Sequence, residues 1–160
     1  MKYRNILVPI DSSDASLRAF DVALDITSGE PDVKIHAVCV IPTDDMPTWV
    51  NSTMDSMGVS SYTPVFDQEK YRSFIDSAVK RDSEHLTEIL NNRTSEFKDK
   101  LKVSVVSSES ITAGIKKYVQ DNECDMIVIG NRGLGRVRSF LGSVSYGVLH
   151  EVDIPVMIVK

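Results

Sequence analysis

The sequence has little cysteine, no long apolar run and no excess of positive charge, and each shortage excludes a class of protein. It holds 2 cysteines and 3 histidines in 160 residues, without the spacing of a metal site or a disulfide framework. No apolar run approaches the roughly 20 residues that span a bilayer, and no secretory signal is visible at the start. We therefore expect reduced thiols and a cytoplasmic location.

Charge excludes two kinds of partner. The chain has 18 Lys and Arg against 23 Asp and Glu, a net charge of -5 at pH 7. A protein of this balance lacks the positive surface that attracts nucleic acid or anionic membranes, so we expect neither as a partner. The length and the 42% hydrophobic content suit one globular domain, which we expect to span residues 1–160.

Short apolar runs alternate with helical patterns along the chain. Continuous apolar runs indicate strands that are buried on both faces, and an alternating pattern indicates the third strand. The predicted strands are residues 5–10, 35–41, 101–105, 126–129 and 154–159. Strict alternation with helices predicts an α/β fold, an open five-stranded parallel sheet with helices on both faces.

One stretch departs from this alternation. Residues 43–64 are rich in Pro, Ser, Thr, Asp, Gly and Met and show no sustained period. We expect a long, partly mobile surface loop there. An amphipathic helix should follow it and end near Asn91.

The glycine-rich segment from Gly130 to Ser145 carries the strongest chemical signal. It lies between a predicted buried strand and the last predicted helix, and from Gly130 to His150 it has three arginines and no acidic residue. Glycine lets the backbone approach an anion closely, and the start of a helix favours phosphate. The segment therefore predicts a phosphate site, with hydroxyl contacts from Ser143 and Ser145. The alternative is that its glycines only end a strand and cap a helix.

Two familiar phosphate motifs are excluded. Gly130 and Gly135 have the opening spacing of a Walker A loop, but Arg136 and Val137 follow instead of Lys and Ser or Thr. A dinucleotide fingerprint would need a third glycine where Arg138 stands, and the first strand has no glycine. Dinucleotide redox chemistry is therefore not expected.

Two further strand ends are distinctive. Asp11 follows the first strand, where its carboxylate either caps the next helix or accepts from a ribose hydroxyl or an adenine amine. Val40, near the end of the second strand, offers backbone groups that can hydrogen-bond an adenine edge. Ligands bind beyond the carboxyl ends of parallel strands, so both residues are candidates.

With these motifs assembled, the chain resembles the universal stress protein family over essentially its whole length. The resemblance rests on the strand into Asp11, the strand into Val40, the glycine segment and the last strand. It implies a sheet of order 3-2-1-4-5 and a homodimer formed through the last strand, Val156 to Val159. It also implies the ATP-binding branch, marked by G-x2-G-x9-G-S/T, with or without Mg²⁺ or Mn²⁺.

The resemblance also assigns roles around the nucleotide. It puts Asp11 and the Val40 backbone on adenosine, and Gly130 and Gly133 at the ribose and phosphates. The residues on the phosphates are Gly142, Ser143 and Ser145, and the other predicted contacts are Pro9, Ile10, Arg132 and Val144. The chain departs from the family pattern at one point, because eight residues rather than nine separate Gly133 from Gly142.

These observations predict an adenine-nucleotide-binding regulatory protein of the stress response with little or no catalysis. Ser143 has no base beside it in the sequence, so at most weak ATP hydrolysis is expected. Two alternatives remain open. One is a nucleotide-free dimer of the same fold that acts through its dimer surface and the 43–64 loop, and the other is a slow adenine-nucleotide hydrolase.

Overall fold

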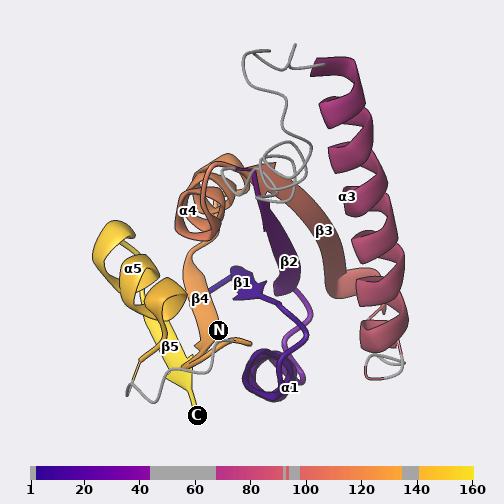
Figure 1. The fold of residues 1–160 in the computed structure, drawn as a ribbon. Helices are drawn as coiled ribbons and strands as arrows, with labels where there is room; N and C mark the ends of the chain where they lie inside the picture. Colours follow the sequence, from indigo (N-terminus) through magenta and orange to yellow (C-terminus); the bar gives the residue numbers. More distant parts are fainter. Residues whose placement is uncertain (1–2, 44–67, 92, 94–97, 135–140) are drawn as a thin grey trace, which may run out of the picture.

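A sheet of five parallel strands forms the centre of the fold (Figure 1). The computed structural model describes residues 3–43, 68–91, 93, 98–134 and 141–160. The strands are β1 (Asn5–Pro9), β2 (Lys34–Pro42), β3 (Leu101–Ser108), β4 (Met126–Gly130) and β5 (Val156–Val159). Their order is β3-β2-β1-β4-β5, with every pairing parallel, which confirms the predicted sheet.

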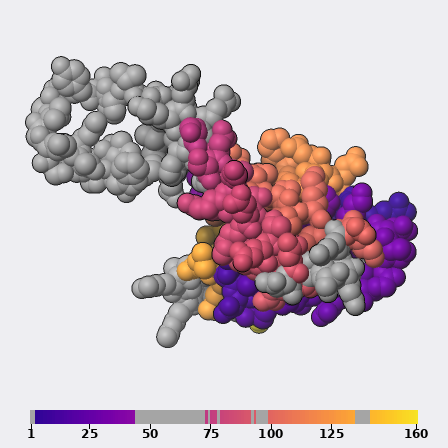
Figure 2. Space-filling view, turned by 90° about the vertical axis from the view of Figure 1, so that its right-hand side faces the viewer, coloured from indigo at the N-terminus to yellow at the C-terminus, as the bar shows by residue number. Residues whose placement is uncertain are grey.

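Helices cover both faces of the sheet, as predicted. They are α1 (Asp14–Thr27), α3 (Gln68–Asn91), α4 (Ile111–Asp121) and α5 (Ser143–Glu151), with a short 3-10 helix over Lys98–Lys100. In Figure 1, α1 and α3 lie on one side of the sheet and α4 and α5 on the other. Figure 2 looks onto the first layer from outside and shows α3 (magenta) across the middle of the surface.

Each helical layer encloses its own apolar core. Successive side chains of a strand point to opposite faces, so Ile6 and Val8 of β1 pack with Phe20 of α1. Leu7, between them, packs on the other face with Ile115 of α4. All five side chains are fully buried. The apolar runs of the sequence are continuous because both faces of each central strand are covered.

The ends of the elements follow local signals. Ser13 and Ser110 cap α1 and α4, and each side-chain oxygen accepts a backbone N–H of the first turn. The last strand begins at Val156 rather than at the predicted Ile154. Pro155 has no N–H to donate, so it joins the sheet only through its carbonyl, which accepts from Ile127 N at 2.9 Å.

The remaining expectations concern the loop, the thiols and the membrane. Thr43 is hydrogen-bonded to the carbonyl of Ser108 at 2.7 Å, and the rest of the predicted 43–64 loop lies outside the described residues. Cys39 and Cys124 are both free thiols, as expected. In the described ranges, no helix has the length and apolar character that a membrane span requires.

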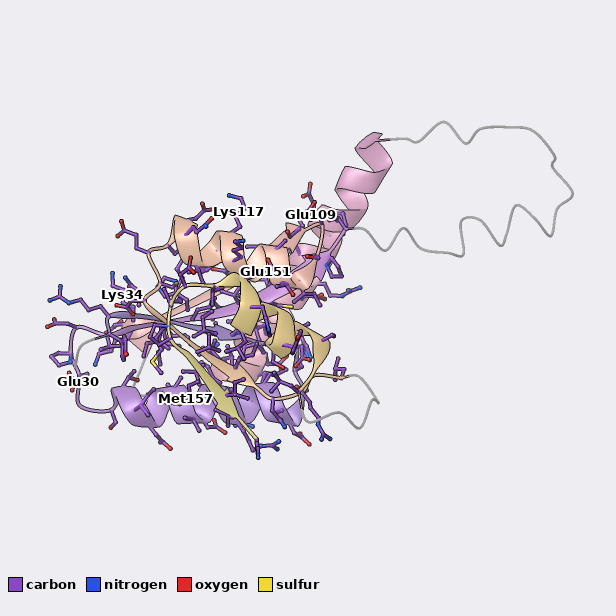
Figure 3. The ribbon with its side chains drawn as sticks, turned by 90° about the vertical axis from the view of Figure 1, so that its left-hand side faces the viewer. Glu30, Lys34, Glu109, Lys117, Glu151 and Met157 are labelled. Carbon is purple, nitrogen blue, oxygen red and sulfur yellow. The ribbon has the colours of Figure 1, made fainter. Side chains whose placement is uncertain are left out.

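The predicted site residues gather at one end of the sheet. Figure 3 shows Glu109, which follows β3, near the end where the strands finish, with Glu30 and Lys34 at the opposite end. The predicted site residues lie in the last part of a strand, directly after a strand or at the start of α5, so the fold brings them to the same end as Glu109.

Candidate functional site

A cavity of about 630 Å³ opens at the carboxyl ends of β1, β2 and β4. The chain places β2 and β3 on one side of β1 and β4 and β5 on the other, so strand order reverses at this point. Such a reversal is where open parallel sheets bind ligands. The fold brings together around this cavity every residue predicted for the site: Pro9, Ile10, Asp11, Val40, Gly130, Arg132, Gly133, Gly142, Ser143, Val144 and Ser145.

Sequence reasoning missed the apolar wall of the cavity. The apolar lining includes Ile111 and Leu141, which are partly exposed, and Val38, Ile115 and Ile129, which are buried. A signal for two of them was present. Because Ser110 caps the helix that follows β3, Ile111 in its first turn and Ile115 one turn later had to lie near the strand ends.

Asp11 links the start of α1 to the glycine segment. Its Oδ1 accepts from the amide of Ser13 at 3.0 Å and from the Ser13 hydroxyl at 2.5 Å. Its Oδ2 accepts from the amide of Leu134 at 3.2 Å. The alternative in which Asp11 itself caps α1 is wrong, because Ser13 accepts the Ser16 amide at 3.2 Å. The carboxylate is therefore held at the rim of the cavity by two segments of the chain.

The three glycines predicted for the site have different surroundings. A Cβ on Gly130 would lie 2.7 Å from the backbone of Ala15, so α1 packs directly against this glycine. A Cβ on Gly133 would collide with the carboxylate of Asp11. A Cβ on Gly142 would meet nothing closer than 3.4 Å, and its φ of -73° and ψ of 160° suit any residue. Packing within the protein therefore explains Gly130 and Gly133 but not Gly142.

The start of α5 lacks a side-chain cap. Gly142 is the N-cap residue and provides no side-chain hydrogen bond, in contrast to Ser13 and Ser110 at the starts of α1 and α4. A helix leaves its first backbone amides without intrahelical acceptors. The residues that carry these amides, Ser143 to Ser145, line the cavity. The helix dipole adds partial positive charge at the same place, so this rim of the cavity favours an anion.

The hydroxyls of the two serines differ. Ser143 is exposed. Ser145 is 3% exposed, and its hydroxyl lies 3.1 Å from the carbonyl oxygen of Asn131 and 3.0 Å from that of Gly142. A hydroxyl has one hydrogen, and in Ser145 it is directed to these carbonyls within the protein. The predicted hydroxyl contact to phosphate thus stays available to Ser143, whereas Ser145 presents its amide.

Val40 offers backbone groups at the end of β1. The ladder between β1 and β2 reaches the pair Pro9 and Val38, and the amide of Ile10 then donates to the Val38 carbonyl at 2.8 Å. Backbone groups along a strand point alternately to its two neighbours. Those of Val40, two residues further on, therefore point to the same side as those of Val38, past the end of β1 and toward the cavity.

Charge is sparse among the described lining residues. Asp11 is the acidic and Arg132 the basic side chain there, while Arg136 and Arg138 lie outside the described residues. Burial, followed by the nearby charges of Asp82 and Asp11, raises the pKa of Cys39, so this lining thiol stays neutral. The described part of the chain has no group of three or more His, Cys, Asp or Glu side chains that could hold a metal ion.

Comparison with known proteins gives a consistent picture. The sequence model of the Universal stress protein family matches residues 2–160. The putative universal stress protein SH1215 of Staphylococcus haemolyticus is 29% identical over 164 residues, covering 100% of this chain and 86% of that protein. Universal stress protein UspA from Lactobacillus plantarum superposes with a TM-score of 0.68 at 25% identity, covering 100% and 99% of the two chains. The universal stress protein from Archaeoglobus fulgidus in complex with dAMP has a TM-score of 0.58 at 18% identity, covering 100% of both chains.

Proposed function

The chain belongs to the universal stress protein family, and on this premise we propose that it is a regulatory protein that binds an adenine nucleotide, ATP in particular, in the strand-end cavity. The observation that carries the proposal is the set of residues that line this cavity. Its inner wall is apolar, and its rim carries the uncapped start of α5. The dAMP complex of the Archaeoglobus protein supports an adenine ligand for this fold.

The residues of the inner wall suit a purine base. The partly exposed side chains of Ile111, Leu141 and Val144 provide an apolar surface of the kind that buries flat rings in ligand sites. The backbone of Val40 adds one donor and one acceptor, which complement the ring nitrogen and exocyclic amine of adenine. The base would therefore be held by apolar contact and oriented by the Val40 backbone.

The residues of the rim suit the ribose and phosphates. The Asp11 carboxylate can accept from ribose hydroxyls, and the amides that begin α5 can donate to phosphate oxygens. The Ser143 hydroxyl and Arg132 add a donor and a positive charge. Space for a close approach remains at Gly142, where a side chain would fill the cradle. A Mg²⁺ or Mn²⁺ ion would be held chiefly by the phosphates, as is usual for magnesium nucleotides.

The proposal also covers how the nucleotide regulates the protein. The protein would act in the stress response as a cytoplasmic homodimer formed through β5, with nucleotide occupancy controlling its binding to a partner protein. β5 is the edge strand of the sheet, and each of its residues is half-buried. An edge strand presents unpaired backbone groups that a second copy can pair.

Two measurements test nucleotide binding. Absorbance near 260 nm in the supernatant of denatured protein detects copurified nucleotide, and calorimetry gives the affinities for ATP, ADP and AMP, with GTP as control. We expect Ser143→Ala to weaken ATP about tenfold or more, because a hydrogen bond to a charged group contributes about 1.5–3 kcal/mol. Gly142→Val should weaken ATP further while the dimer stays intact. Affinities unchanged in both variants would contradict the proposal.

The same material separates the two alternatives. A wild-type protein without copurified nucleotide and without a calorimetric signal would support the nucleotide-free dimer. Multiple-turnover ATP cleavage that Asp11→Ala abolishes would support the hydrolase.

A further inference from the structure

The start of α5 is hydrogen-bonded directly to the end of β4. The amide of Gly142 donates to the carbonyl of Asn131 at 2.8 Å. The Ser145 hydroxyl lies 3.1 Å from the same oxygen and 3.0 Å from the carbonyl of Gly142. We call this arrangement of Ser145, Gly142 and Asn131 the Ser145 clamp. It joins the two ends of the connection that carries the glycine segment.

We propose that Ser145 is a positioning residue for nucleotide binding, and that the Ser145 clamp sets the place of the α5 start relative to Gly133. In this proposal Ser145 acts through Gly142 and the helix amides and does not touch phosphate with its hydroxyl. The inference rests on the proposed function, because it explains how the phosphate rim is held in place.

The Ser145 clamp also gives the shortened connection a physical meaning. Eight residues separate Gly133 from Gly142, one fewer than the family pattern. Ten residues lie between Asn131 and Gly142 and could extend over about 33 Å, whereas one hydrogen bond of 2.8 Å joins these two residues directly. A stretch of this length can close the same hydrogen bond with one residue more or fewer, so the loss of one residue need not move Gly142. The hydrogen bonds of the Ser145 clamp, and not the length of the connection, therefore determine the geometry of the site.

The contacts around Ser145 make it suitable for substitution. Without its hydroxyl, the carbonyl of Asn131 still accepts from Gly142 N, and the carbonyl of Gly142 still accepts from Tyr146 N at 2.9 Å. Ser145→Ala thus leaves neither acceptor unpaired, so the large penalty for a buried unsatisfied group does not apply. The variant should fold and differ from the wild type mainly in the Ser145 clamp.

The first test uses the nucleotide-free protein. Hydrogen exchange of the Gly142 amide, followed by NMR, reports whether the clamp is closed. We expect Ser145→Ala to speed this exchange about tenfold, as the loss of one net hydrogen bond implies, and Ser145→Thr to restore slow exchange. Ser143→Ala is the matched control and should leave the exchange unchanged. Wild-type exchange in Ser145→Ala, with an unchanged urea midpoint, would overturn the proposal.

The second test uses ATP affinity measured by calorimetry. Ser145→Ala should weaken ATP about tenfold through misplaced amides. One glycine inserted between Leu134 and Gly135 restores the family length, and it should change the affinity less than about threefold. An insertion that shifts the affinity more than tenfold, with unchanged Gly142 exchange, would overturn the proposal. A wild type that binds no adenine nucleotide would instead refute the proposed function. The exchange data would still show whether the Ser145 hydroxyl holds Gly142 in place.

Discussion

At the scale of single residues, Gly130 and Gly142 look alike in the sequence but do different work in the structure. A Cβ on Gly130 would lie 2.7 Å from the backbone of Ala15 in α1, whereas one on Gly142 would have ordinary contacts, the nearest at 3.4 Å. Glycine at position 130 is needed for the fold. Glycine at position 142 leaves space on the cavity side, where a ligand would approach.

This difference predicts that one added methyl group mainly lowers stability at position 130 and mainly weakens ATP binding at position 142. Gly130→Ala should lower the free energy of unfolding by about 1–3 kcal/mol, the usual cost of overpacking against a fixed backbone. Gly142→Ala should lower it less, by about 0.5–1 kcal/mol, because alanine is a poorer N-cap than glycine, and yet weaken ATP binding. Urea denaturation and calorimetry of both variants measure the two quantities. Equal loss of stability in the two variants would contradict this assignment.

His36 is a second residue with an unusual environment. It is 5% exposed in β2, and its Nδ1 lies 3.2 Å from the hydroxyl of Tyr118. Its Nε2 is buried without a hydrogen-bond partner in the described structure. Burial first, and then the positive charges of Lys102 and Lys34, lower the pKa of His36 below 6.5. The folded protein therefore keeps this imidazole neutral under conditions in which the unfolded chain protonates it.

This lowered pKa predicts acid sensitivity. The contribution of His36 to stability is fully present above pH 6.5 and is lost as the pH falls from 6.5 through the lowered pKa. This one group can change the free energy of unfolding by at most about 1.4 kcal/mol per pH unit. Urea denaturation between pH 8 and about pH 5 measures it. His36→Leu should flatten the curve of unfolding free energy against pH. The control His85→Leu, which alters an exposed histidine of α3, should not. Equal curves for the wild type and His36→Leu would refute the explanation.

At the scale of elements, the two serine caps provide a matched pair. Ser13 accepts the Ser16 amide at 3.2 Å and Ser110 accepts the Ala113 amide at 3.1 Å. Replacing either with alanine should lower the free energy of unfolding by about 1 kcal/mol. Ser13 also donates its hydroxyl to Asp11, so Ser13→Ala alone should weaken ATP, by about two- to tenfold. Calorimetry that finds the same ATP affinity in both cap variants would argue against a role for Asp11.

Some features of the elements could be predicted from the sequence, and others could not. Strand positions were predictable because burial on both faces leaves continuous apolar runs, and Ser110 was recognisable because a cap is a local signal. Strand order is not contained in such runs, and it was expected only from the family resemblance. Ile111 has the sequence pattern of a core residue, and only the reversal of strand order places it beside a cavity. The inward-directed hydroxyl of Ser145 likewise depends on Asn131, fourteen positions away.

At the scale of the whole molecule, the edge strand β5 has two distinct sides. The carbonyls of Pro155 and Val159 accept from Ile127 N at 2.9 Å and Asn131 N at 2.6 Å, so they face β4. Backbone groups alternate along a strand, and those of Val156 and Ile158 therefore point to the open edge. Figure 3 shows β5, with Met157, beside α1 at the front of the view. A second copy paired along β5 would need the outward N–H groups.

This geometry predicts a variant that separates the dimer from the fold. Ile158→Pro removes an N–H that points outward, while the carbonyls of Pro155 and Val159 keep their bonds to β4. Ile158→Ala is the control, because it loses the same apolar side chain, which packs against the α4 and α5 layer, but keeps the N–H. Light scattering after size exclusion should find Ile158→Pro monomeric and Ile158→Ala dimeric. Since the cavity lies at the strand ends and excludes Ile158, both should retain ATP affinity within about threefold. A proline variant that stays dimeric would show that β5 does not form the interface.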